Sequence, residues 1–163
     1  MCQYLAQRCD PDNLRGLAVR AGEPDFGGWL NWLHHGEATL TFPQTIVLRY
    51  GSLEPDERKL PQAAADYAKW FIARLRGIDA VLSQHEFLCA DRFTAADISV
   101  GYALMLASEI DLAARLPPAV AAYWERLKLR DGFQRALAKQ HDTAVAQGVS
   151  PWPSPVPPPS AVA

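Results

Sequence analysis

An all-α fold is predicted by two features of this sequence. Apolar side chains recur at intervals of three and four residues along most of the chain, which is the period of an amphipathic helix. No segment reads convincingly as a strand, and the only β-branched cluster, residues 45–48, continues a helical pattern. The 163 residues are 49% hydrophobic, so the chain can form one domain with an ordinary core.

The first helix is expected in residues 2–9, with Met1 inside it or at its edge. It ends before Pro11 because the residue that precedes a proline, here Asp10, is disfavoured in the helical region. A glycine-containing loop follows and leads to the next helix.

That next helix begins at Pro24, since proline is tolerated in a first turn, and runs toward Tyr50. Pro43 is expected to kink or interrupt it, because proline lacks the N–H that the helical ladder needs. Four residues at helical spacing define one face: Trp29, Leu33, Gly36 and Leu40.

The clearest amphipathic signal belongs to a long helix that begins after Pro55. Its apolar residues alternate steps of three and four: Ala64, Tyr67, Phe71, Leu75, Ile78 and Leu82. Two more helices are expected near the C-terminus, one opened by Pro117 and a last one that begins near Phe133, after the break at Asp131 and Gly132.

Residues Phe93 to Ile98 carry a capping motif. Thr94 is placed as an N-cap, and the carboxylate of Asp97 can reach back to the backbone N–H of Thr94, which makes a capping box. Phe93 and Ile98 are placed as a hydrophobic staple. The helix that follows, as far as Ala107, is apolar nearly all round and is therefore expected to be buried.

The segment 148–163 is expected to be a disordered, proline-rich tail. Six of the 13 prolines of the chain lie in it. A stretch so rich in proline can form neither helix nor sheet and stays extended and solvated.

Composition excludes several classes of function. The net charge is -2 without a long run of one sign, so neither a nucleic acid nor an acidic membrane is an expected partner. No apolar run reaches the roughly 18 residues of a membrane-spanning helix, and the N-terminus lacks the order of a signal peptide. A reduced, cytoplasmic protein is the expectation.

The histidines and cysteines predict no metal or catalytic site. His34 and His35 are adjacent on a helix, so their side chains point about 100° apart and cannot chelate one metal. Cys2, Cys9 and Cys89 form no Cys-x-x-Cys pair and are expected to be unreactive thiols. Five aromatic residues are expected in the core, with a hydrophobic substrate pocket as the alternative: Trp29, Trp32, Trp70, Phe71 and Tyr102.

Several segments resemble, in the same order, glutathione S-transferases of the bacterial, beta-class-like type. They are residues 2–6, 32–34, 87–98 and 123–136. The resemblance implies the C-terminal helical domain of that family in residues 24–147, preceded in residues 1–10 by a remnant of the last helix of its thioredoxin-like domain. The resemblance departs from the family at Asp131, where members commonly carry proline after the arginine.

The family reaction is attack of the glutathione thiolate on a hydrophobic electrophile. The family's thioredoxin-like domain supplies the Tyr, Ser or Cys that activates the thiol, a cis-proline and a Glu-Ser pair, and none of these has a counterpart here. The resemblance therefore implies a transferase-like protein that is weak or inactive as this truncated chain, which leaves its status as an enzyme open. The alternatives are a non-catalytic helical module for ligand binding or dimerisation, and a truncated gene or misplaced start codon.

The resemblance also implies where glutathione and substrate would be contacted. The positions that close the site in the family correspond to His34, Ala38 and Thr41, which share a helical face at i, i+4 and i+7. Glu37 would reach a glutathione amine across a homodimer. The alternative is a polar, solvated surface without a ligand. Catalytic residues and a metal are not expected, and Phe93, Thr94, Asp97 and Ile98 are assigned structural roles.

Overall fold

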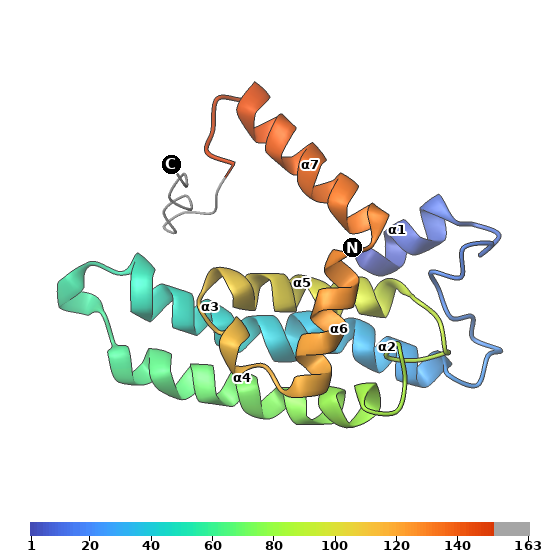
Figure 1. Ribbon diagram of the computed structural model, residues 1–163, viewed down its shortest axis with the longest axis horizontal. Coiled ribbons are helices and arrows are strands. Elements are labelled where there is room, and N and C mark those ends of the chain that lie inside the picture. Colours follow the sequence, from blue (N-terminus) through green and yellow to red (C-terminus); the bar gives the residue numbers. More distant parts are fainter. Residues whose placement is uncertain (152–163) are drawn as a thin grey trace. The chain divides into compact units, whose positions relative to one another are not determined.

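The computed structural model describes residues 1–151 of the chain, and in this part every regular element is a helix (Figure 1). The predicted all-α class is confirmed. Most of the expected proline-rich tail, residues 152–163, lies outside the described residues. The elements are α1 (Cys2–Cys9), α2 (Phe26–His34), η1 (His35–Thr41), α3 (Phe42–Leu48), η2 (Arg49–Leu53), η3 (Asp56–Arg58), α4 (Pro61–Leu82), α5 (Ala95–Glu109), η4 (Ala113–Arg115), α6 (Pro118–Lys128) and α7 (Asp131–Ala146).

The chain divides into two compact units, residues 1–124 and the segment from Glu125 onward. The larger unit holds the core around α5, which packs against α1, α2 and η1, while α3 packs along α4. Small residues on the buried sides of α5 allow these close approaches: Ala95, Ala96, Gly101, Ala103 and Ala107. None of the helices in residues 1–151 is long and apolar enough to cross a membrane.

One expectation for α5 is wrong. Ile98 is 45% exposed and Tyr102 is 54% exposed, so the helix is not buried all round. These residues are four apart and mark one strip that faces outward. An apolar sequence alone could not show which strip its neighbours would leave uncovered.

The aromatic residues also divide between core and surface. Trp29 and Phe71 are buried as expected, but Trp70 is 39% exposed. The ring of Trp70 belongs to an aromatic cluster with Phe42 and Tyr67, at centroid separations of 5.2 to 6.2 Å. This cluster lies on α3 and α4, and half of the Phe42 surface is in contact with solvent.

Pro43 interrupts the α-helix, as expected, and the interruption takes the form of a π-helical segment before the proline. The chain runs through the π-helical segment η1 into α3, with Pro43 in the first turn of α3. Side chains then donate to carbonyls near the position where proline removes a backbone donor: Thr41 Oγ1 to Gly36 O at 2.9 Å, and Gln44 Nε2 to Leu40 O at 3.1 Å. The widened helix therefore continues through the proline, with Leu40, Pro43 and Gln44 buried.

The crossing of η1 and α5 requires glycine at position 36. A Cβ atom on Gly36 would lie 2.5 to 2.6 Å from atoms of Ser99, including its backbone carbonyl. The Ser99 hydroxyl donates to the carbonyl of Leu33 at 2.7 Å across the same crossing. This contact fixes how closely α2 and η1 approach α5. It therefore also fixes the position of the residues predicted to contact a ligand, His34, Glu37, Ala38 and Thr41.

Candidate functional site

The ligand-contacting residues predicted from the family resemblance lie on α2 and η1. His34, Glu37 and Ala38 are exposed, whereas Thr41 is half-buried. The hydroxyl of Thr41 is committed to the carbonyl of Gly36, so it can only accept a hydrogen bond from a ligand. None of these residues lines either of the two hollows described below for residues 1–151.

His35, the neighbour of His34, belongs to the packed part of the molecule. Its ring stands edge-on to the ring of Trp32 at a centroid distance of 5.4 Å. Burial lowers the pKa of His35, which keeps the imidazole neutral near pH 7. Among residues 1–151 no group of three or more His, Cys, Asp or Glu side chains is placed to hold a metal ion.

The capping box that opens α5 is present in the structure. Thr94 N–H donates to Asp97 Oδ2 at 2.7 Å, and the Ala96 N–H donates to Thr94 Oγ1 at 3.2 Å. Ile98 is largely exposed, and the ring of Phe93 packs edge-on to Phe87 at 6.2 Å. The start of α5 therefore depends on the polar box and on aromatic packing in the preceding loop.

Asp97 has further partners that only the tertiary structure supplies. Its Oδ1 accepts from the hydroxyl of Tyr123 on α6 at 2.8 Å and from the N–H of Leu88 at 3.3 Å. Burial raises the pKa of Asp97, and the hydrogen bonds from Thr94, Tyr123 and Leu88 oppose that rise. Asp97 thus joins the loop, α5 and α6 and stands apart from solvent, which suits a structural role.

Cys89, in the same loop, is half-buried. Burial is the main cause that raises the pKa of its thiol to about 11. The thiolate is the nucleophile in cysteine chemistry, so this pKa makes Cys89 a poor one at neutral pH. The expectation of an unreactive thiol at this position agrees with that shift.

Sequence reasoning missed the ordered loop between α1 and α2. Asn13, at φ 55°, exchanges two hydrogen bonds with the backbone of Ala18, at 2.9 and 3.1 Å. Arg92 lies in the loop just before α5. Its guanidinium donates to the carbonyls of Gly16 and Ala18, both at 3.1 Å, and to Glu23 Oε2 at 2.8 Å. The loop is therefore fastened to the start of α5.

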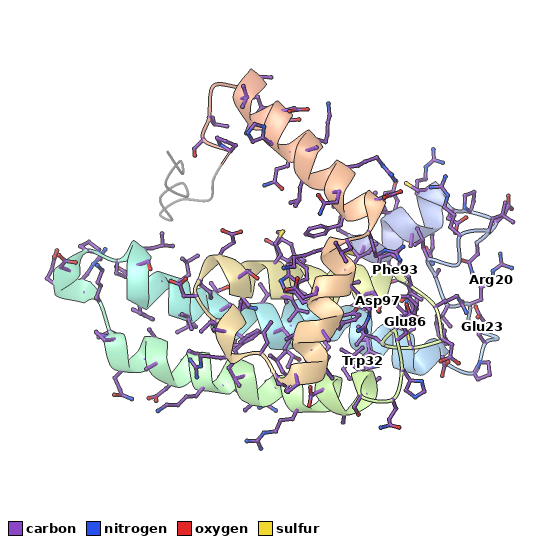
Figure 2. The ribbon with its side chains drawn as sticks, viewed as in Figure 1. Arg20, Glu23, Trp32, Glu86, Phe93 and Asp97 are labelled. Atoms are coloured by element: carbon purple, nitrogen blue, oxygen red, sulfur yellow. The ribbon has the colours of Figure 1, made fainter. Side chains whose placement is uncertain are left out.

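Two hollows border this loop. One, of about 530 Å³, is open and charged, with Arg15, Arg20 and Arg92 facing Asp12 and Glu23. Figure 2 shows Arg20 and Glu23 together on the loop, and the Arg20 N–H donates to Glu23 Oε1 at 2.7 Å. This bond, with the contribution of Arg92, lowers the pKa of Glu23. The guanidinium groups of Arg20 and Arg92 thus already have partners within the protein, the carbonyl of Asp12 for Arg20 and Glu23 with two carbonyls for Arg92.

The other hollow, of about 360 Å³, lies between α1, the loop and the start of α2. Phe26 and Trp29 form one wall, and Gln3 and Gln7 of α1 stand on another. The only signal for it in the sequence was the spacing of the two glutamines, four residues apart on one face of a short helix. Trp29 was expected in the core, with a hydrophobic substrate pocket as the alternative, and it is 1% exposed and lines this hollow.

Comparison with known proteins finds similarity at the level of structure. No protein-family model and no curated protein matches the sequence. Ure2p5 from Phanerochaete chrysosporium, cocrystallised with 1-(S-glutathionyl)-2,4-dinitrobenzene, superposes with a TM-score of 0.74 at 22% identity, over 90% of this chain and 68% of that one. The glutathione transferase URE2P8 from the same organism, with oxidized glutathione, gives 0.71 at 21% identity, over 88% of this chain and 64% of that one.

The ternary complex of BphK, a bacterial GST, gives a TM-score of 0.68 at 19% identity, over 84% of this chain and 64% of that chain. At such identities the likeness shows the fold, which is that of the helical domain of glutathione transferases. The chain spans between 64% and 68% of the length of these three proteins.

Proposed function

We propose that this chain is a glutathione S-transferase-like protein of the bacterial, beta-class-like type. The observation that carries the proposal is the likeness to glutathione transferases over 88 to 90% of the chain, at TM-scores of 0.71 to 0.74. The reaction of such a protein is attack of the glutathione thiolate on an electrophilic carbon of a hydrophobic substrate. Glutathione is the cosubstrate, and the cytoplasm is the proposed location.

In this proposal the outer face of α2 and η1 closes one side of the glutathione and substrate cleft. His34, Glu37 and Ala38 support it because they are exposed on consecutive turns and therefore open to a ligand. The crossing at Gly36 holds these turns rigidly on α5. Thr41 contributes an acceptor oxygen, and Glu37 a carboxylate that could meet the glutathione amine of a second subunit.

We propose further that the chain by itself turns over weakly or not at all, because His34 and Thr41 line only one side of a cleft. Proximity contributes to rate only when the thiol is bound and oriented. Helix α1 and the residue before it expose three apolar side chains, Met1, Tyr4 and Leu5, at 90%, 63% and 47%. These apolar residues share one face, which supports a covering partner, and a homodimer is proposed.

Calorimetry with glutathione and a conjugation assay on an aryl halide test these statements. The purified chain should give no turnover above background. His34→Ala is compared with His85→Ala, a second exposed histidine outside the proposed cleft. Micromolar glutathione binding with turnover that is lost in His34→Ala alone would contradict the proposal of a weak chain and would show a complete site on the helices.

The DNA upstream of the Met1 codon tests whether a thioredoxin-like domain precedes this chain. If an open frame there encodes a strand-rich domain ending in Glu-Ser, the longer protein should conjugate glutathione. Failure of that longer protein to bind glutathione would contradict the transferase proposal itself.

A non-catalytic helical module remains the second candidate. The aromatic cluster of Phe42, Tyr67 and Trp70, partly exposed on α3 and α4, favours it because such a patch suits binding or dimerisation without chemistry. Association that persists in the absence of any glutathione binding would favour this candidate, and a longer, active transferase would exclude it.

A further inference from the structure

The smaller hollow beside α1 is lined by a residue with an unpaired polar group. Trp29 lines this hollow, its side chain is 1% exposed, and its indole Nε1 has no hydrogen-bond partner. An unpaired buried N–H costs about 1 to 3 kcal/mol relative to a paired one. A ligand that carries an acceptor into the hollow would remove that cost.

The remaining polar groups of the lining define what a ligand would meet. Asp10 and Asn13 are already used, because Asp10 Oδ2 accepts the Arg15 N–H at 2.9 Å and Asn13 is paired with the backbone of Ala18. The side-chain amides of Gln3 and Gln7 on α1 can both donate and accept.

The apolar part of the lining favours a flat ligand. Phe26 and Trp29 stand 6.2 Å apart with their ring planes inclined by 32°, and Pro11 and Val19 lie beside them. Aromatic walls of this kind stack readily on another ring. A volume of about 360 Å³ is near the lower limit for small-molecule sites, so one substituted ring is the appropriate size.

From these contacts we propose that the pocket between α1 and the loop binds a small, uncharged aromatic compound with an amide or ketone oxygen, which accepts the hydrogen bond of Trp29 Nε1. We expect an uncharged ligand because the lining contains one negative group, the Asp10 carboxylate, and one positive group, the Arg20 guanidinium. The glutamine amides then recognise the second polar atom of a carboxamide. This site is separate from the proposed glutathione cleft on α2 and η1 and does not depend on it.

The pocket is also preorganised. Its loop wall is held by the paired side chain of Asn13 and by the three bonds that Arg92 donates to Gly16, Ala18 and Glu23. A ligand therefore orders little of the chain when it binds, and little affinity is lost to conformational entropy.

Nuclear magnetic resonance of the tryptophan indole N–H groups tests the proposal on the full chain, with benzamide as the probe. The Trp29 signal, assigned by its loss in Trp29→Phe, should move downfield and saturate with benzamide. Toluene, which has the ring but no acceptor, should not move it downfield. An unmoved Trp29 signal with benzamide, or equal affinities for benzamide and toluene, would overturn the proposal.

Substitutions test whether benzamide binds in this pocket. Trp29→Phe keeps an aromatic wall but removes the donor, so benzamide should bind about tenfold more weakly. Trp70→Phe, at a partly exposed ring outside the pocket, should leave the affinity unchanged. Ala21 is an exposed residue of the lining, so Ala21→Phe should fill the entrance without disturbing the core and abolish binding. Unaltered binding in Ala21→Phe would refute the assignment even if Trp29→Phe failed to fold.

Discussion

Replacement of Asp97 by alanine should destabilise the protein markedly. The buried carboxylate accepts from the N–H and the hydroxyl of Thr94, from the N–H of Leu88 and from the hydroxyl of Tyr123, and alanine removes the acceptor of these four bonds. The Thr94 hydroxyl can rotate to another acceptor, so at about 1 kcal/mol for each of the other three bonds the free energy of unfolding should fall by about 3 kcal/mol. Thr94→Ala removes the acceptor of the Ala96 N–H and should cost only about 1 kcal/mol.

Urea denaturation followed by circular dichroism measures both losses. With a slope near 2 kcal/mol per M, the midpoint should fall by about 1.5 M for Asp97→Ala and by about 0.5 M for Thr94→Ala. The matched control is Asp66→Ala, at an exposed aspartate of α4, which should change stability by less than about 0.5 kcal/mol. The reasoning is refuted if Asp97→Ala lowers the midpoint no further than Asp66→Ala does.

The same residue predicts a dependence on pH. Burial raises the pKa of Asp97 above its ordinary value of 3.8, so the folded protein binds this proton more tightly than the unfolded chain. The resulting stabilisation is complete below a pH of about 4 and is lost as the pH rises through the raised pKa. The stability of the wild type relative to Asp97→Asn, which cannot titrate, should therefore decline as the pH rises above about 4. A relative gain by the wild type would mean that the hydrogen bonds outweigh burial and lower the pKa.

Three further predictions concern packing, reactivity and association. Gly36→Ala should lower stability by about 1 to 3 kcal/mol because its methyl group would meet the backbone of Ser99. Gly77→Ala, in open space on α4, should instead raise stability by about 0.5 to 1 kcal/mol. Equal effects of the two substitutions on thermal unfolding would contradict the close crossing of η1 and α5. At pH 8 Cys89 should be alkylated about 100-fold more slowly than an ordinary thiol, since its pKa is about 11 rather than 9.0, and peptide mapping compares it with the exposed Cys9. Sedimentation should show a dimer or larger species; a clean monomer that binds no hydrophobic dye would exclude it.

Local chemistry made much of the fold predictable. The capping box at Thr94 and Asp97 is formed within four consecutive residues, so it could be read from the sequence and is present at the start of α5. The six apolar residues of the long helix, spaced by three and four, likewise predicted α4, which runs from Pro61 to Leu82. Such signals depend on neighbours along the chain, and the tertiary structure did not need to supply them.

Other features depend on residues that are distant in sequence. Asp97 was expected to accept from the backbone N–H of Thr94, but its bond to Tyr123 joins positions 26 residues apart. Ile98 is 45% exposed on the first turn of α5, a result of packing that composition does not encode. Trp29 follows a helical pattern like any core residue, and only the arrangement of α1 and the loop around it makes Trp29 line a pocket and leaves its N–H unpaired. Sequence periodicity thus determined which segments are helices, while the packing of those helices decided which polar groups are satisfied and where the surface is hollow, because both depend on contacts between segments that the local pattern does not contain.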